Sequence, residues 1–455
     1  MLRQLRLRPS FALLLCSSFF LLPSRTEALP EKELRQRFQL AVELEKQFKW
    51  DQARDIYEEL LSQRDPGLKI RERYLRSLRR GWQVRRQQDT SYRKEVLSIE
   101  YAQALRMYTI ISNTLLDLSV DKKKLDPAKL FRKGVEELDA ALGDPYFQQQ
   151  HLPGIKLEKI EEFRVFLRKT WGSARGLSRK EAAKQLGEVA MEAELKLQLN
   201  PTVTVMEFAC GSCYAIDEYT TYLTPNQLRE LVQSLARNEV VGLPSMASVS
   251  GGMLPNSVGL MKITSFTDLT VQEVDAFLNN PAQRGMKGLI LDLRGNNGGL
   301  FDSAIDTARR FLSKGTIAST VHQDAKYNVV YQAKNANALM VPLVLLVDGD
   351  TASAAEVLAG ALKDNDRALL IGQTTYGKSC TQCVLKLPNA LGGVPTGGLK
   401  VTEARFFSPK GIAYSGRGIT PHIFIEEQMP SQSDMTDHAL TRALVEMTRL
   451  LAMPK

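Results

Sequence analysis

A short apolar run, VPLVLLV at residues 341–347, constrains the fold of this chain more than any other feature. The run is rich in β-branched residues and far too short to span a membrane, which is typical of a buried parallel strand. An amphipathic helical pattern follows over 353–364, and a second strand-like run ends at Ile371. A strand–helix–strand crossover brings the carboxyl ends of both strands to one edge of the sheet, where α/β proteins hold their sites. We therefore predict a functional site at this edge.

Two reactive side chains follow these strands. Ser353 begins the predicted helix after the first strand, and Lys378 stands just beyond the second. The topology therefore predicts that a hydroxyl and an amine lie within reach of each other.

A glycine-rich loop, RGNNGG at 294–299, follows another buried apolar run and lies at the same kind of strand end. Glycines let backbone amides face inward and bind an anion or oxyanion, although a sharp strand-to-helix turn also needs them. An amide from Gly298 or Gly299, together with the amide of Ala354 at the helix start, is the expected oxyanion hole.

Three interpretations compete for the loop that carries Lys378. Residues 372–379, GQTTYGKS, satisfy the phosphate-loop pattern GxxxxGK[ST] after a strand. That motif also needs a helix immediately afterwards, and the run that ends before Pro388 leaves little room for one. Nucleotide binding is therefore disfavoured.

A Ser-His-Asp hydrolase is the second interpretation. The chain has four histidines, and Ser353 lacks the GxSxG elbow of such enzymes. His422, in a late GITPH turn, stays open as a base in this interpretation.

A Ser–Lys dyad is the third interpretation. A lysine serves as a base only when it is neutral, and burial away from carboxylates is expected to lower its pKa. Lys378 lies in a stretch free of carboxylates from Gln373 to Gln382. The side-chain amide of Gln382 is a group that could orient the lysine amine without adding a negative charge.

The first 28 residues have the layout of a secretory signal peptide. Arginines precede an apolar stretch, FALLLCSSFFLL at 11–22, which is shorter than the roughly 20 residues of a membrane span. We therefore expect an exported chain that acts in the periplasm, at the envelope or as a secreted protein. An uncleaved anchor is the alternative.

A helical domain is expected over 29–199, because this region is charged, rich in helical periodicity and poor in glycine. Two amphipathic segments between 41 and 61 resemble one tetratricopeptide hairpin. The hairpin either packs on the rest of the domain or binds a partner protein. The arginine-rich stretch 71–93 is compatible with a solvated helix face or with contact to an anionic membrane surface.

The formal net charge of the chain is +9, which is mildly basic for its length. No basic patch is interleaved with aromatic residues, so nucleic-acid binding is not predicted. From about residue 200 the pattern changes: Thr202–Glu207 alternates like a strand, and α/β periodicity follows from Val258.

Residues 200–430 resemble the C-terminal processing, or tail-specific, serine peptidases. The resemblance implies an α/β core of the crotonase and ClpP-like type with a mixed, largely parallel sheet, preceded here by the all-α domain. It also implies protein or peptide substrates, a serine endopeptidase activity and no cofactor. The matching segments, in family order, are IDEYTTYLTP at 216–225, GLILDLRGNNGG at 288–299, the stretch 351–382, VTEARFFSPKG at 401–411 and GRGITPHI at 416–423.

The family pattern carries over to individual positions of this chain. It implies a nucleophile at Ser353, a lysine base at Lys378 and a supporting glutamine at Gln382. It implies oxyanion donors in the glycine loop and at the residue after the serine. Asp364 matches a family aspartate, for which a structural role in a helix-terminal turn is expected.

Two departures from the family stand out. A PDZ domain usually lies between the YLTP helix and the next strand, but here only about 20 residues separate Arg237 from Val258, against roughly 50 for a small domain. We therefore predict a core over 200–430 without a PDZ domain, followed by a C-terminal helix in 431–455. The second departure is His422, which stands where the family has an aspartate.

Four cysteines form two CxxC pairs, Cys210 with Cys213 and Cys380 with Cys383. The wide separation of the pairs disfavours a zinc knuckle, and export favours disulfides within or across the pairs. Free thiols and a zinc site remain as alternatives.

The sequence thus predicts an exported serine endopeptidase with an N-terminal helical domain. The alternative from another class is a catalytically silent envelope protein that binds a partner through its helices.

Overall fold

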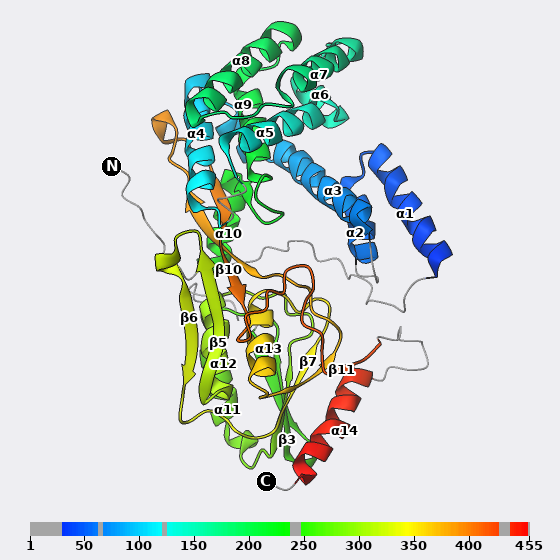
Figure 1. The fold of residues 1–455 in the computed structure, drawn as a ribbon, viewed down its shortest axis with the longest axis vertical. Helices are drawn as coiled ribbons and strands as arrows, with labels where there is room; N and C mark the ends of the chain where they lie inside the picture. The colour runs from blue at the N-terminus through cyan, green and yellow to red at the C-terminus, as the bar shows by residue number, and fades with distance from the viewer. Residues whose placement is uncertain (1–29, 62–66, 121–124, 237–246, 427–436, 454–455) are drawn as a thin grey trace. The chain divides into compact units, whose positions relative to one another are not determined.

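The computed structural model describes residues 30–61, 67–120, 125–236, 247–426 and 437–453 (Figure 1). The chain forms two compact units. The helical unit comprises Ala28–Ser234 and Gln382–Glu403, and the described residues of the α/β unit fall within Leu235–Thr381 and Ala404–Lys455. The signal peptide predicted at 1–28 lies outside the described residues. In the ranges given, no helix combines the length and the apolar character needed to cross a membrane.

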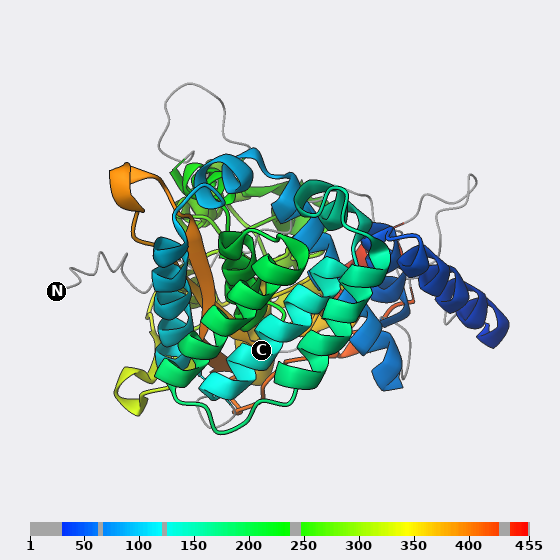
Figure 2. The ribbon, with the colours of Figure 1, turned by 90° about the horizontal axis from the view of Figure 1, so that it is seen from above.

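The helical unit is built from amphipathic helices, as the glycine-poor periodic pattern predicted. Figure 2 shows these helices from above, with α1 in dark blue. A π-helical turn at Tyr92–Val96 follows α3, and the strand β1 (Thr221–Leu223) precedes α10. The helices are α1 (Glu31–Lys46), α2 (Trp50–Leu61), α3 (Gly67–Gln88), α4 (Tyr101–Leu118), α5 (Pro127–Leu142), α6 (Pro145–His151), α7 (Leu157–Trp171), α8 (Arg179–Leu197), α9 (Pro201–Cys213) and α10 (Pro225–Ala236).

Helix α9 corrects the strand-like interpretation of Thr202–Glu207. The Asn200 side chain accepts a hydrogen bond from the Thr202 amide at 2.8 Å, and Pro201 occupies the first helical position, so the chain starts a capped helix here. Every residue from Thr202 to Cys213 is buried. A helix buried on all sides has no polar face, so its alternating β-branched residues resemble a strand in the sequence.

Helices α1 and α2 pack together in the region where a hairpin was predicted. Ala41, Ala53, Tyr57 and Leu60 form a small buried cluster that also takes in side chains of α3. This cluster is separate from the larger core of the helical unit.

The α/β unit holds a six-stranded sheet of order β11-β8-β7-β4-β3-β2. Among the described strands, β2 and β3 pair antiparallel and the other neighbours pair parallel, so the sheet is mixed and largely parallel, as predicted. The strands are β2 (Val249–Leu254), β3 (Val258–Ile263), β4 (Gly288–Asp292), β7 (Leu343–Val347), β8 (Leu369–Gly372) and β11 (Ile423–Phe424).

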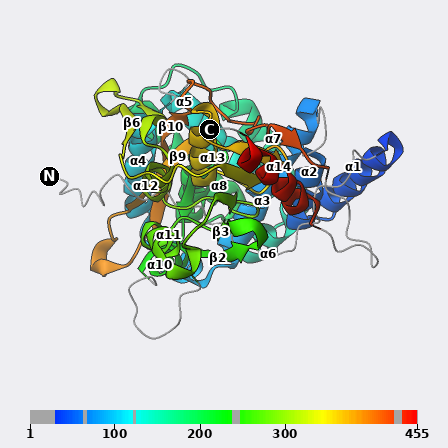
Figure 3. The same ribbon diagram turned by 90° about the horizontal axis from the view of Figure 1, so that it is seen from below.

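Side chains on the central strands alternate between two buried faces. Leu291 and Leu345 pack with α12 (Phe301–Phe311) and α13 (Ala354–Asp364). Ile290 and Val344 belong to a second cluster with α14 (His438–Ala452), drawn in red in Figure 3. A parallel sheet covered on both faces explains why its strands are continuous apolar runs. The helix α14 falls within the C-terminal segment predicted to be helical.

An antiparallel layer completes the α/β unit. Strand β5 (Lys314–His322) pairs with β6 (Val329–Lys334) and with the last residues of β10 (Gly398–Phe407), while α11 (Thr270–Asn279) follows β3. The beginning of β10 pairs with β1 inside the helical unit, and β9 (Cys380–Lys386) also pairs with β10. The predicted α/β core and preceding all-α domain are confirmed.

Candidate active site

The serine lies on the predicted crossover, β7–α13–β8, whose two strands are parallel. The turn before it is fixed because Asp348 Oδ1 accepts the Thr351 amide at 2.9 Å and Thr351 Oγ1 donates to the Leu293 carbonyl at 3.0 Å. Ser353 has φ +57° and ψ −116°, a conformation that L-residues rarely adopt. A nucleophile on a sharp, strained strand-to-helix turn has this kind of backbone, even without the GxSxG motif.

Glu356 connects the serine turn to the lysine loop. Its side chain is fully buried, and one oxygen, Oε2, accepts the Ser353 amide at 2.9 Å and the Lys378 amide at 2.8 Å. The other oxygen, Oε1, accepts the Thr375 hydroxyl at 2.6 Å and the Gly377 amide at 2.8 Å. Burial raises the pKa of Glu356 to about 7, against the lowering effect of these four donors. One carboxyl group therefore holds the backbone of both candidate catalytic residues.

Sequence reasoning missed Glu356, although a signal for it was present. Residues 353–356, SAAE, fit the S-x-x-E capping pattern at a helix start. The Ser353 amide does donate to Glu356, as that pattern predicts.

The lysine loop is tied to its surroundings at several further points. The Tyr376 amide donates to the Thr351 carbonyl at 3.0 Å, which joins the loop directly to the serine turn. Lys378 is only 2% exposed. The loop continues into the strand β9 rather than into a helix, which disfavours the phosphate-loop interpretation further.

A strap at residues 414–419 packs against the lysine loop. Thr375 Oγ1 accepts the Ile419 amide at 2.7 Å, and Ser379 Oγ accepts the Tyr414 amide at 2.6 Å. A side chain at Gly377 would place its Cβ 2.7 Å from the backbone nitrogen of Gly418, so glycine is required by close approach.

The glycine loop lies against the serine turn. Asn296 is fully buried, and its carbonyl accepts the Ala352 amide at 2.9 Å. Its side-chain Oδ1 accepts the Gly298 amide at 2.8 Å, so that N–H is already used. Gly299 and Ala354 have amides for which the described part of the chain provides no acceptor. Of the three predicted oxyanion donors, these two are therefore the ones with an available N–H.

Changing Gly298 to alanine should abolish most activity, because the new Cβ would lie 2.9 Å from both the Ser353 Cβ and the Ala352 carbonyl oxygen. We expect a loss of at least about 100-fold in kcat/KM, since misplacement by about 1 Å has costs of this size. The matched control is Gly295→Ala in the same loop, where φ is +72° but nothing lies within 4 Å of the added Cβ. Equal activities of the two variants would contradict the close approach.

Gln382, the predicted supporting residue, lies on β9 in the segment that belongs to the helical unit. The side chain is buried, and its Nε2 donates to Thr402 Oγ1 at 3.4 Å.

His422, the base of the Ser-His alternative, has a structural use. Its Nδ1 accepts the Leu370 amide at 2.9 Å, and its own amide donates to the Leu370 carbonyl at 2.9 Å. The first bond makes Nδ1 an acceptor, so the neutral ring carries its proton on Nε2 and has no free nitrogen to act as a base. This arrangement favours the lysine interpretation. Asp364 accepts the Lys410 amide at 3.1 Å, which agrees with the structural role expected for it.

The four cysteines are free thiols in the structure, so the expected disulfides are not formed there. Cys213 Sγ donates to the Ala209 carbonyl at 3.5 Å, along its own helix. Burial raises the pKa of Cys213 to about 12 and that of Cys210 well above its usual value, which disfavours the thiolate that metal binding needs. Within the described ranges, no group of three or more His, Cys, Asp or Glu side chains is placed so that it could hold a metal ion.

An arginine fork stabilises the base of the glycine loop and was also missed by sequence reasoning. Arg294 Nη2 lies 2.8 Å from Asp292 Oδ2 and 2.8 Å from Asp437 Oδ2. Asp437 caps α14 by accepting the Leu440 amide at 2.9 Å. The arginine therefore links the end of β4 to the start of α14.

Comparison with known families assigns this architecture. Residues 257–425 match peptidase family S41. This segment is a peptidase family S41 domain. It contains Ser353, Glu356, Lys378 and the glycine loop.

Curated relatives of the S41 domain share about a third of its residues. The carboxy-terminal-processing protease of Bartonella bacilliformis is 34% identical over 38% of this chain and 40% of its own length. The carboxyl-terminal-processing protease of Synechocystis is 34% identical over 45% of this chain and 47% of its own length. The chain thus matches less than half the length of these relatives. A solved photosystem II D1 C-terminal processing protease is 18% identical, with a TM-score of 0.43 over 72% of this chain and 94% of that one.

Proposed function

We propose that this chain is a serine endopeptidase that hydrolyses peptide bonds of protein substrates through an acyl-enzyme. The observation that carries the proposal is the buried Glu356 carboxyl, which accepts the amides of Ser353 and Lys378 at 2.9 and 2.8 Å. A nucleophile and its base must be held at a fixed distance from each other. Glu356 provides this because the same carboxyl group accepts a backbone hydrogen bond from each of the two residues. The S41 match supports the same reaction class.

Each group has a defined step in the proposed reaction. Ser353 Oγ attacks the scissile carbonyl while neutral Lys378 Nζ takes its proton. The amides of Gly299 and Ala354 donate to the oxyanion that forms. When the intermediate collapses, the C–N bond breaks and Lys378 returns the proton to the leaving amine. Water then attacks the acyl-enzyme, with Lys378 again taking a proton and Ser353 Oγ regaining one.

The proposed place of action is outside the cytosol, in the periplasm, at the envelope or in the medium. The leader at 1–28, with its arginines and short apolar stretch, supports this part of the proposal. The proposed supporting role of Gln382 is to orient the lysine amine, and it rests on the family pattern.

A serine-reactive phosphonate tests the proposed dyad directly. We expect labelling of one residue, Ser353, and loss of labelling in Ser353→Ala and in Lys378→Ala. Lys363→Ala is the matched control, because this lysine donates to the Thr420 carbonyl at 2.6 Å and has no role in the proposed reaction. Unchanged labelling of Lys378→Ala would remove lysine from the mechanism. Absence of labelling and of cleavage products from the wild type would favour the silent binding protein.

Substrate tails provide a second test, because the PDZ domain that captures substrate C-termini in this family is predicted to be absent. Residues 237–246, where part of the interval lies, are outside the described residues, and β2 already begins at Val249. We expect matched peptides with a free or an amidated apolar C-terminus to be cleaved with kcat/KM values within about threefold, measured by mass spectrometry. Only tail binding worth more than about 0.7 kcal/mol would separate the two values further. A loss of cleavage on amidation would contradict this prediction.

A further inference from the structure

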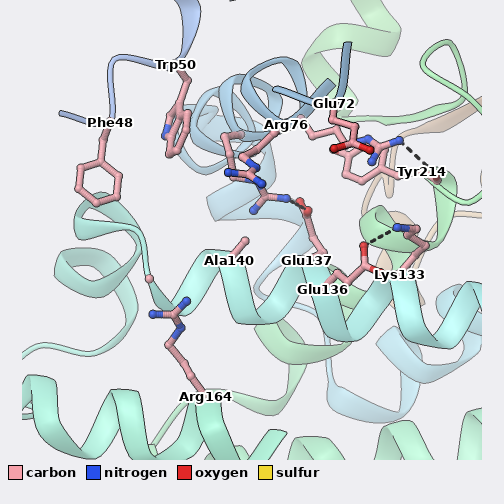
Figure 4. Close-up of a pocket in the computed structure, with 13 residues that line it drawn as sticks. Phe48, Trp50, Glu72, Arg76, Lys133, Glu136, Glu137, Ala140, Arg164 and Tyr214 are labelled. Atoms are coloured by element: carbon pink, nitrogen blue, oxygen red, sulfur yellow. Dashed lines mark hydrogen bonds and ion pairs between the residues drawn. The ribbon is translucent and has the colours of Figure 1, made fainter. Parts of the chain in front are cut away.

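A pocket of about 420 Å³ lies within the helical unit, formed entirely by residues of that unit (Figure 4). Its volume falls in the range of about 300–1,000 Å³ that is typical of ligand pockets. Figure 4 shows Phe48 and Trp50 toward one end and Tyr214 toward the other, with Arg76 between them. The lining residues with charged side chains are Glu72, Arg76, Arg79, Arg80, Lys133, Glu136, Glu137 and Arg164.

Two arginines of the pocket have donors that the protein does not use. Arg76 is 60% exposed in its side chain, and its single ion contact within the described residues is Glu45, 3.7 Å away. The Nε of Arg79 is buried and has no hydrogen-bond partner in the described part of the chain. The Nη2 of Arg79 donates to the Tyr214 carbonyl at 3.4 Å, and the guanidinium lies 5.2 Å from the centroid of the Tyr214 ring. A buried donor without an acceptor is costly, so it points to a ligand that supplies one.

The other charges of the pocket are largely neutralised by neighbours. Glu137 pairs with Arg80, and Glu136 pairs with Lys133. Arg164 is paired outside the lining, with Asp139 and Glu161.

Glu72 is the exception, because it is exposed and has no ion pair within the described residues. Glu45 lies 2.9 Å from Arg73 and 3.7 Å from Arg76, so Arg76 shares this carboxylate with a nearer cation. The incompletely neutralised side chains of the lining are therefore Arg76 and Arg79, opposed by Glu72. Their sum is positive, so the pocket favours an anionic ligand.

The aromatic end of the pocket favours an apolar group beside the anion. Phe48 is 43% exposed, and its ring meets Trp50 edge to face at 5.8 Å. Phe48 also has φ +57°, which turns the chain sharply between α1 and α2. Trp50 is half-buried, so the pair presents a partly exposed apolar surface that would be stabilised by contact with another apolar side chain.

We propose that this pocket binds a peptide segment in which a carboxylate stands next to an apolar side chain. The carboxylate bonds to Arg76 and Arg79, since a guanidinium matches a carboxylate with two parallel hydrogen bonds. The apolar neighbour covers Phe48 and Trp50. An arginine that lines a pocket is reached by a projecting side chain or chain end more readily than by a flat lipid surface. This binding does not require peptide-bond hydrolysis, so it would also occur if the chain were catalytically silent.

Fluorescence anisotropy with a labelled, C-terminally amidated Gly-Glu-Phe-Glu-Gly peptide tests the proposal. The full chain carries Ser353→Ala, so the probe cannot be cleaved by the proposed site. We expect Arg76→Gln and Arg79→Gln each to raise Kd by about tenfold, the effect of losing one charge-assisted bond. Glu72→Gln should lower Kd, because it removes the opposing charge. Arg175→Gln is the matched control, since Arg175 is exposed and lies outside the pocket.

Two further probes identify the source of the carboxylate. Replacing both glutamates of the amidated probe by glutamine should abolish binding. If the same glutamine peptide binds again when its C-terminus is a free carboxylate, the ligand of the pocket is a peptide C-terminus. Binding of the glutamine peptide with an amidated end would overturn the proposal. So would equal Kd values for Arg76→Gln, Arg79→Gln and the control. Arginine-dependent binding of phosphatidylglycerol vesicles, without binding of the probe, would assign the pocket to a membrane surface instead.

Discussion

Replacing Glu356 with glutamine should lower kcat by about 100-fold. The carboxyl accepts four hydrogen bonds, and three of the donors are backbone amides, which cannot reverse their role. A glutamine side chain has one acceptor oxygen, so its NH₂ group faces at least one buried N–H in either orientation. An unsatisfied buried donor costs about 1–3 kcal/mol. The serine turn or the lysine loop would shift to relieve this cost, and the altered distance between Ser353 and Lys378 would raise the activation barrier by a similar amount.

The same variant should change how stability depends on pH. Burial raises the pKa of Glu356 to about 7 in the folded chain, above its usual value of 4.5. Between these two pKa values, Glu356 is protonated more fully in the folded state than in the unfolded state. Its contribution to the free energy of unfolding is therefore present below pH 4.5 and is lost as pH rises through 7. The wild type should therefore lose about 3 kcal/mol between pH 4.5 and 7.5 from this group, and Glu356→Gln should not.

Two controls separate position from charge at this residue. Glu356→Asp keeps the carboxylate but is one methylene shorter, so it should also lose activity because it cannot reach both loops. Glu426→Gln, at an exposed position of the same unit, should change neither kcat nor the pH dependence of unfolding. Wild-type activity in Glu356→Gln would show that the loops hold their position without this carboxyl group.

Removing one partner of the buried ion cluster in the helical unit should destabilise the protein by about 3–5 kcal/mol. Glu207 is fully buried and accepts Arg86 Nη2 at 2.8 Å, Gln83 Nε2 at 2.6 Å and Gln87 Nε2 at 2.7 Å. In Arg86→Leu, the Glu207 carboxylate loses its cation and stays in a low dielectric, which is costly. Chemical denaturation of the variant should show the loss.

A double variant distinguishes charge burial from packing. Arg86→Leu combined with Glu207→Leu removes both charges, so it should recover part of the stability that either single change loses. The exposed pair Arg179 and Asp117, 2.6 Å apart, is the matched control, and removing either partner should cost less than about 1 kcal/mol. Strictly additive losses in the double variant would contradict an uncompensated charge as the cause.

Much of the α/β unit follows from local pattern. Leu343–Val347 is a continuous apolar run because the strand is buried on both faces, and the helix after it begins at a residue with capping character. The positions of Ser353 and Lys378 after consecutive parallel strands could therefore be predicted from chain order. The glycine loop after β4 was predictable for the same reason.

The helical unit shows where local pattern fails. Thr202–Glu207 alternates like a strand, but the capped and fully buried α9 has no polar face to reveal a helical period. The spacing of the cysteine pairs left disulfides, free thiols and a zinc site open, and the structure has the four residues as free thiols. The pocket with Phe48, Arg76 and Tyr214 joins residues far apart in the chain, so no sequence window contains it.

The sequence by itself determined where the reactive groups stand along the chain: a serine after one strand, a lysine after the next strand and a glycine loop after an earlier one. These features depend on contacts between near neighbours along the chain. Only the tertiary structure decided which groups share a partner. It gave the Ala352 amide to the Asn296 carbonyl and joined the serine turn to the lysine loop through Glu356. Such choices arise because a buried polar group must find partners wherever the fold brings them.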